Sequence, residues 1–143
     1  MNRRSHFLVL IVVALASVAL GACGGGSETA KKEDPVVVEP IDGTDLGRLT
    51  LTASASERLN IQTTTVESAG DGLVVPSAAV IIDPAGVYWV YTNPEPLVFI
   101  RHELQAVREE GQQAFFVAGP ATGTSVVTIG VPELYGAEFG IGK

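Results

Sequence analysis

The sequence predicts a small all-β domain, a β-roll or β-sandwich-like arrangement of antiparallel hairpins with one short helix, behind a signal peptide and a flexible linker. Three observations predict it. From Arg48 onward, short apolar stretches alternate with turn residues. The 143 residues leave room for one small domain. The chain has a single Cys, so the domain must be stabilised by hydrophobic burial and not by an internal disulfide.

The first 22 residues have the pattern of a signal peptide. Arg3 and Arg4 precede an uncharged apolar run, residues 7–20, that only Ser17 interrupts. This run is shorter than the roughly 20 residues that a permanent membrane-spanning helix needs. Small residues follow it, so residues 1–22 are predicted to be removed.

The only Cys of the chain follows this leader directly. Leu20-Gly21-Ala22-Cys23 resembles the lipobox of bacterial lipoproteins, in which the Cys thiol receives a diacylglyceryl group before cleavage on its N-terminal side. The alternative is a plain secretory signal with an incidental Cys at the cut. Two acyl chains give stable anchoring where one does not. We therefore expect lipidation at Cys23 and a location on the extracytoplasmic face of the cell membrane.

The charge balance excludes a nucleic-acid-binding role. The chain has 9 basic and 16 acidic side chains, a net charge of −7. Loss of Arg3 and Arg4 with the leader lowers the basic count to 7 and the net charge to −9. Such an acidic chain has no basic stripe to neutralise phosphates. It is also repelled by anionic lipid headgroups, so the acyl chains must hold it at the membrane.

Residues 23–47 are predicted to be a flexible, lipid-anchored linker. They begin with Gly24-Gly25-Gly26-Ser27, contain Pro35 and Pro40, and show no helical or strand periodicity. Residues 35–38 could instead form a short strand, but the flanking prolines and acids favour the linker.

Residues 48–143 are predicted to form the β domain. Residues 54–60 are the one expected helix, capped by Ser54 or Ser56, with Leu59 pointing inward. Asp83-Pro84-Ala85-Gly86 is a strong hairpin turn. Strands are expected at 49–52, 62–67, 80–82, 87–91, 97–107, 114–117 and 125–129, with turns at 93–96, 109–111 and 119–123, in the order of a meander.

Strand alternation assigns side chains to faces. Val87, Trp89 and Tyr91 should share one face, and Tyr88 and Val90 the other. On the next strand, Phe99, Arg101 and Glu103 should lie together. Trp89, Tyr91 and Phe99 could be core or a docking patch, and core is the preferred interpretation.

The order of several motifs resembles that of a known family. Val74-Val75-Pro76-Ser77-Ala78-Ala79-Val80, the turn at 83–86, Val87-Tyr88-Trp89-Val90-Tyr91, Arg101 and the stretch GPATGTSVVTIG at 119–130 are similar to the C-terminal part of periplasmic adaptor (membrane fusion) proteins of tripartite efflux pumps. Residues 49–52 and 59–63 also look like the segment that opens the adaptors' membrane-proximal domain. The resemblance covers residues 48–130.

This resemblance implies a domain built from both halves of the chain and placed beside an inner-membrane transporter. The chain departs from the family pattern at Val107, Pro120 and Thr124. The long adaptor insertion, which holds the helical hairpin, the lipoyl-like domain and a β-barrel, is replaced here by residues 68–73, a short hairpin loop. Docking to an outer-membrane channel is therefore not implied.

The sequence offers no converging set of catalytic residues. His102 is expected on the strand surface, Ser77 lacks a nearby base, and Glu109 and Glu110 lie in an exposed turn. Residues 136–143 resemble a phosphate loop only faintly and are expected to be a flexible tail. No metal or cofactor is predicted.

We therefore expect a non-enzymatic, lipid-anchored accessory protein that contacts an inner-membrane transporter or a sister adaptor. The alternative is a solute- or metal-binding lipoprotein that delivers its ligand to a transporter.

Overall fold

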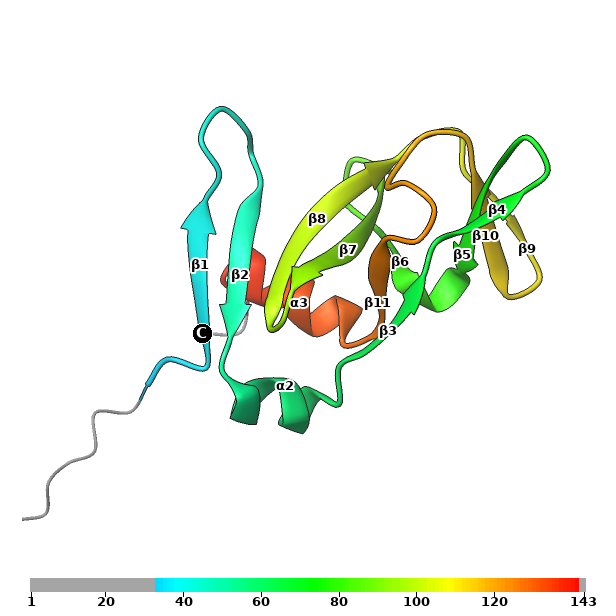
Figure 1. Cartoon of the computed structure of the whole chain (residues 1–143). Helices are drawn as coiled ribbons and strands as arrows, with labels where there is room; N and C mark the ends of the chain where they lie inside the picture. Colours follow the sequence, from blue (N-terminus) through cyan, green and yellow to red (C-terminus); the bar gives the residue numbers. More distant parts are fainter. Residues whose placement is uncertain (1–32, 142–143) are drawn as a thin grey trace, which may run out of the picture. The chain divides into compact units, whose positions relative to one another are not determined.

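A computed structural model describes residues 33–141 of the chain (Figure 1). The predicted leader, Cys23 and residues 23–32 of the predicted linker lie outside the described residues. The described part consists mostly of antiparallel β-strands, with two short α-helices and a single 3-10 turn, so the predicted fold class is confirmed.

The strands form two sheets. The larger sheet has the order β1 (Val36–Pro40), β2 (Gly47–Leu51), β8 (Val98–Leu104), β7 (Tyr88–Glu95), β11 (Ser125–Ile129) and β3 (Gln62–Thr65), and β6 (Val80–Ile82) also pairs with β7. The smaller sheet has the order β4 (Glu67–Ala69), β5 (Gly72–Pro76), β10 (Gln113–Phe116) and β9 (Arg108–Glu110). The predicted meander is wrong, because β2 pairs with β8 and β3 with β11 across long stretches of sequence.

Strand β1 corrects the predicted linker. It pairs with β2 in register from Val36 opposite Leu51 to Pro40 opposite Gly47. The Thr52 N–H donates to the Pro35 carbonyl at 3.1 Å. Because hydrogen-bonded pairs alternate along an antiparallel ladder, Pro40 falls at a position whose missing N–H faces away from β2. The domain therefore begins before Val36, and the alternative strand reading of this segment is the correct one.

Several predicted boundaries also shift. The predicted strand at 62–67 divides into β3 and β4, which belong to different sheets. The turn predicted at 93–96 begins later, because β7 continues through Asn93 and Pro94 to Glu95, with an irregularity in register, and the turn falls at residues 96–97. The predicted strand at 97–107 ends at Leu104, and Glu109 and Glu110 belong to β9 and not to the turn. The short hairpin expected between Glu67 and Val74 is confirmed, but its turn is limited to residues 70–71, because residues 68–69 and 72–73 pair within β4 and β5.

Helix α2 (Ala53–Leu59) confirms the predicted helix with a different cap. The Thr52 hydroxyl, and not Ser54 or Ser56, accepts from the Ala55 N–H at 3.2 Å. The helix ends at Asn60, which adopts the left-handed conformation. Leu59 packs against buried core residues, as predicted.

Helix α3 (Val131–Glu138) includes the first three residues of the segment 136–143 that the sequence predicts to be a flexible tail, so that prediction is wrong for residues 136–138. Pro132 lies in its first turn, where the absent N–H is not needed. The helix contacts β1, β2, β6 and β7 along one side of the larger sheet (Figure 1). Within residues 33–141, neither helix is both long and apolar enough to cross a membrane.

Two hydrophobic cores lie on either side of the larger sheet. The strand alternation predicted for residues 88–91 is confirmed, because Tyr91 and Val90 belong to different cores and both are fully buried. The core beneath α3 contains Leu49, Leu51, Ala55, Tyr91, Phe99, Val127, Val131 and Leu134. The other contains Val66, Val75, Ala79, Val90, Leu104, Ala114, Phe116 and Val126, from both sheets.

Candidate functional site

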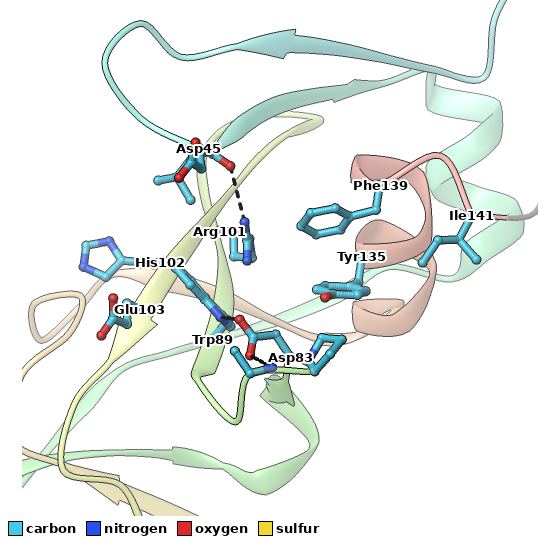
Figure 2. Close-up of a pocket in the computed structure, with 12 residues that line it drawn as sticks. Asp45, Asp83, Trp89, Arg101, His102, Glu103, Tyr135, Phe139 and Ile141 are labelled. Atoms are coloured by element: carbon cyan, nitrogen blue, oxygen red, sulfur yellow. Dashed lines mark hydrogen bonds between the residues drawn. The ribbon is translucent and has the colours of Figure 1, made fainter.

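An open pocket of about 860 Å³ lies between α3 and the adjoining part of the larger sheet (Figure 2). The β1–β2 loop, the β6–β7 turn, β7, β8 and the C-terminal end of α3 all contribute to it. Its lining consists of Asp45, Leu46, Asp83, Pro84, Ala85, Trp89, Arg101, His102, Glu103, Tyr135, Phe139 and Ile141.

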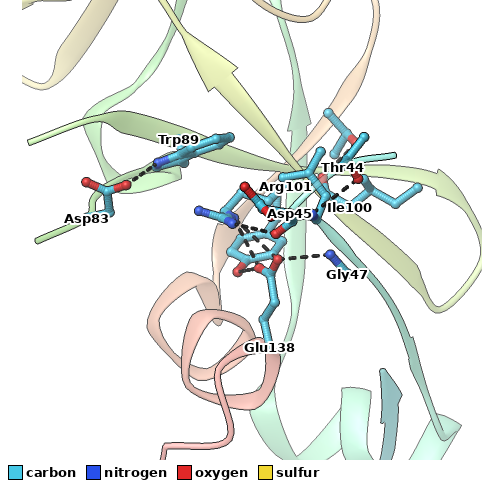
Figure 3. Close-up of polar contacts among 11 residues, drawn as sticks. Thr44, Asp45, Gly47, Asp83, Trp89, Ile100, Arg101 and Glu138 are labelled. Atoms are coloured by element: carbon cyan, nitrogen blue, oxygen red, sulfur yellow. Dashed lines mark hydrogen bonds and ion pairs between the residues drawn. The ribbon is translucent and has the colours of Figure 1, made fainter. Parts of the chain in front are cut away.

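Arg101 forms the charged floor of this pocket. Its side chain is only 6% exposed and its Nε lies 3.2 Å from Oε2 of Glu138 (Figure 3). The Nη2 atom donates to the Asp45 carbonyl at 3.5 Å. The guanidinium carbon lies 4.0 Å from the ring centre of Trp89 and 4.9 Å from that of Phe139. The cation is thus satisfied by a carboxylate and by two aromatic rings.

Glu138 is the anion that balances Arg101, and it ties α3 to the sheet. Its side chain is 4% exposed. One carboxylate oxygen accepts from the Tyr91 hydroxyl at 2.5 Å, and the other accepts from the Gly47 N–H at 3.1 Å. Burial, together with the neighbouring Glu138 carboxylate, raises the pKa of Tyr91 above its ordinary value. The phenol therefore remains a neutral donor.

Asp83, in the β6–β7 turn, holds Trp89, which forms one wall of the pocket. Its Oδ1 accepts from the backbone N–H groups of Ala85 and Val87, at 2.8 and 2.9 Å, and closes the predicted hairpin turn. Its Oδ2 accepts from the indole N–H of Trp89 at 3.0 Å. The hydrogen bond from the Val87 backbone, followed by that from Trp89, lowers the pKa of Asp83. Trp89 is consequently held by a carboxylate that stays ionised at neutral pH.

The rim combines apolar and acidic side chains. Phe139 is 49% exposed and Ile141 is 66% exposed. Asp45 and Glu103 are also exposed. The pairing of β2 with β8 brings the segments of Asp45 and Glu103 together, and the docking of α3 adds Phe139 and Ile141 beside them.

The structure places the residues singled out from the sequence in different environments. Cys23 lies outside the described residues. Tyr91 and Phe99 are core, as preferred, whereas Trp89 is half-buried and forms a pocket wall. His102 is exposed on β8, as predicted, and lies at the pocket rim.

The three remaining residues, Ser77, Glu109 and Glu110, lie outside the pocket. Ser77 is in the 3-10 turn η1 (Ser77–Ala79), where its buried hydroxyl has no hydrogen-bond partner among the described residues. Glu109 is exposed on β9 of the smaller sheet, as is its neighbour Glu110. The structure therefore brings none of these three side chains together with His102.

Sequence reasoning missed the contribution of the C-terminal segment. Glu138, Phe139 and Ile141 were assigned to a tail, although Pro132 and the helical spacing of Val131, Leu134 and Tyr135 are signals of a helix. Strand alternation did place Arg101 on the same strand face as Phe99, but its partner Glu138 lies 37 residues away.

The geometry suits binding. Nε and Nη2 of Arg101 and the carboxylates of Glu138 and Asp83 all have hydrogen-bond partners within the fold, and what faces outward is an aromatic and apolar surface with an acidic rim. Within residues 33–141, no three His, Cys, Asp or Glu side chains gather in a way that could hold a metal ion.

Comparison with protein-family models, with curated proteins and with solved structures finds no match to this chain. Its function is therefore inferred from its own residues and their arrangement.

Proposed function

We propose that the chain is a lipid-anchored, extracytoplasmic accessory protein that acts by protein–protein contact with a membrane transporter or a sister adaptor. The observation that carries the proposal is the exposed apolar surface of Phe139 and Ile141 beside the half-buried Trp89. Aromatic side chains in a rigid, partly enclosed surface are typical of the energetically dominant part of protein interfaces.

The resemblance to the membrane-proximal domain of efflux adaptors supports the choice of partner. In those adaptors the domain is built from both ends of the chain. Here the early strand β3 pairs with the late strand β11, and the residues between them include the short β4–β5 hairpin. A chain with this arrangement and without the other adaptor modules retains the part that lies beside a transporter.

The predicted anchor supports the same proposal. Lipid on Cys23 confines the protein to the bilayer surface and so raises its effective concentration near an integral membrane partner. A modest interface is then sufficient for association. Changing Cys23 to Ser should release the protein from membranes or leave the leader uncut. Normal maturation with unchanged membrane retention would contradict the anchor.

Site-specific photo-crosslinking in intact cells tests the contact itself. A crosslinking amino acid is placed at Ile141, Val117 and Val37, which are 66%, 69% and 50% exposed, on three separate surfaces. The proposal expects that at least one position forms a discrete product with one integral transporter or adaptor protein, identified by mass spectrometry. It fails if all three positions react only with lipid or with abundant proteins in proportion to their amounts.

The size of the pocket favours one alternative function, the carriage of a small solute, because drug-sized ligands occupy sites of about 300–1,000 Å³. Native mass spectrometry of protein purified from its own membranes tests this alternative. A small molecule of constant mass, absent from a Trp89→Ala variant, would favour solute carriage over protein contact.

A further inference from the structure

We infer that the pocket between α3 and strands β7 and β8 receives a segment of the partner protein in which an apolar or aromatic side chain is flanked by Lys or Arg. This inference rests on the proposed function and specifies the chemistry of the partner.

The walls select an apolar side chain. Trp89 is held by Asp83, and Phe139 lies against the guanidinium of Arg101, so both rings are fixed before anything binds. Ile141 extends the same apolar surface outward and is 66% exposed (Figure 2). A preorganised surface loses little side-chain entropy on binding, which favours an inserted aromatic or aliphatic group.

The rim selects positive charge. Three carboxylates, from Asp45, Asp83 and Glu103, line the pocket. The one cation in its lining, Arg101, is already paired with the buried Glu138. The pocket is therefore electrostatically negative, in a chain whose net charge is −7. Basic groups beside the inserted side chain would complement the rim and steer association.

An anionic partner group is disfavoured, although an arginine is present. Nε of Arg101 is occupied by Glu138, Nη2 donates to the Asp45 carbonyl, and Trp89 and Phe139 stack on the guanidinium. A carboxylate or phosphate that approached the remaining Nη1 would have to pass the carboxylates of the acidic rim. The arginine thus serves as part of the floor.

The pocket has a built-in reporter. Trp89 is the only Trp in the chain, so tryptophan fluorescence, excited selectively over that of the three Tyr, reports on this site alone. The full chain, reconstituted in phosphatidylcholine vesicles that carry no net charge, is titrated with three tetrapeptides. These are acetyl-Lys-Leu-Phe-Lys-amide, its Glu-Leu-Phe-Glu counterpart and its Lys-Gly-Gly-Lys counterpart.

We expect a saturable change in Trp89 fluorescence with the first peptide, and binding at least about tenfold weaker for the other two. Raising NaCl from about 50 to about 500 mM should weaken binding of the first peptide severalfold through screening. Equal binding of the Lys and Glu peptides, or the absence of a saturable change, would overturn the inference.

Variants localise the effect. The double variant Asp45→Asn with Glu103→Gln removes two rim charges and should weaken binding of the Lys-Leu-Phe-Lys peptide about fivefold. The control double variant Glu109→Gln with Glu110→Gln, on the smaller sheet, should change the affinity for this peptide less than about twofold. Ile141→Ser should also weaken it, and Val117→Ser, at a similarly exposed apolar position, should not. Equal effects of the pocket and control variants would contradict the assignment.

Two further outcomes separate this inference from the proposed function. If benzyltrimethylammonium binds more tightly than the Lys-Leu-Phe-Lys peptide, the pocket is a solute site and the inference about a partner segment is wrong. If the peptide selectivity holds but cellular crosslinks never reach a transporter or adaptor, the proposed function fails and the pocket chemistry stands. If crosslinks to a transporter form from Val37 or Val117 but not from Ile141, the proposed function stands, and the inference that the partner segment enters this pocket is wrong.

Discussion

Replacing Glu138 by Ala should destabilise the domain far more than its position near the end of α3 suggests. The substitution leaves the guanidinium of Arg101 without its counter-ion at a side chain that is 6% exposed. It also removes the acceptor of the Tyr91 hydroxyl and of the Gly47 N–H. Loss of one partner of a buried ion pair costs about 3–5 kcal/mol. Small domains have only about 5–15 kcal/mol of stability in total, so about a fifth of it or more would be lost.

Urea denaturation followed by Trp89 fluorescence measures this cost, and hydrogen exchange of the α3 amides shows where the structure opens. Glu95→Ala is the matched control, because Glu95 pairs with Arg48 at 3.4 Å but its side chain is 64% exposed. Exposed ion pairs contribute about 0–1 kcal/mol. We expect a large loss with early exchange in α3 for Glu138→Ala, and a small loss for Glu95→Ala.

The combination of Arg101→Met with Glu138→Leu isolates the electrostatic part. With both charges gone, no buried ion is left unpaired, so the double variant should be more stable than either single variant. The reasoning is refuted if Glu138→Ala costs no more than Glu95→Ala, or if the double variant loses the sum of the two single effects.

Three further predictions concern pH and backbone conformation. The lowered pKa of Asp83 adds stability that is present above the unfolded-state value of about 4 and is lost as pH falls through the folded value, so Asp83→Asn should make the acid limb of the urea midpoint shallower. The raised pKa of Tyr91 means that the unfolded chain releases its phenol proton first, so stability should fall as pH rises above 10.0, and Tyr91→Phe should remove that part of the fall. Gly130 has φ +97°, and an added Cβ would lie 2.1 Å from Cδ1 of Ile61, so Gly130→Ala should lower the free energy of unfolding by more than about 1 kcal/mol. Gly123→Ala, at φ +85° in open space, should cost less by the same denaturation assay.

Sequence patterns succeeded where structure is local. The Asp83 turn and the opposite faces of Val90 and Tyr91 follow from short-range stereochemistry, which a single sequence displays. The patterns failed at β1, because prolines at both ends argue against an interior strand. They are acceptable at a sheet edge, where one side of the ladder needs no N–H groups. Whether a strand lies at an edge depends on the sheet order, which periodicity does not contain.

The sequence patterns also failed to predict the C-terminal helix α3, for a related reason. An eight-residue helix is marginal by itself, so its existence depends on tertiary contacts. Those contacts converge on Glu138, whose partners Gly47, Tyr91 and Arg101 come from three different strands. From the sequence alone, a charged residue such as Glu138 in a Gly-rich segment indicates a solvated tail. Its buried position becomes evident only when the three partner strands are placed around it.

The same contacts make stability and binding separable by experiment. Glu138 holds α3 against the sheet, and Phe139 and Ile141 follow that helix directly, so Glu138 places both apolar side chains at the pocket. Ile141 is 66% exposed and contributes only surface. A protein whose pocket is preorganised in this way should lose both stability and peptide binding with Glu138→Ala, but only binding with Ile141→Ser. If Ile141→Ser lowered stability as much as binding, the apolar rim would be part of the core, and the argument for a docking surface would fail with it.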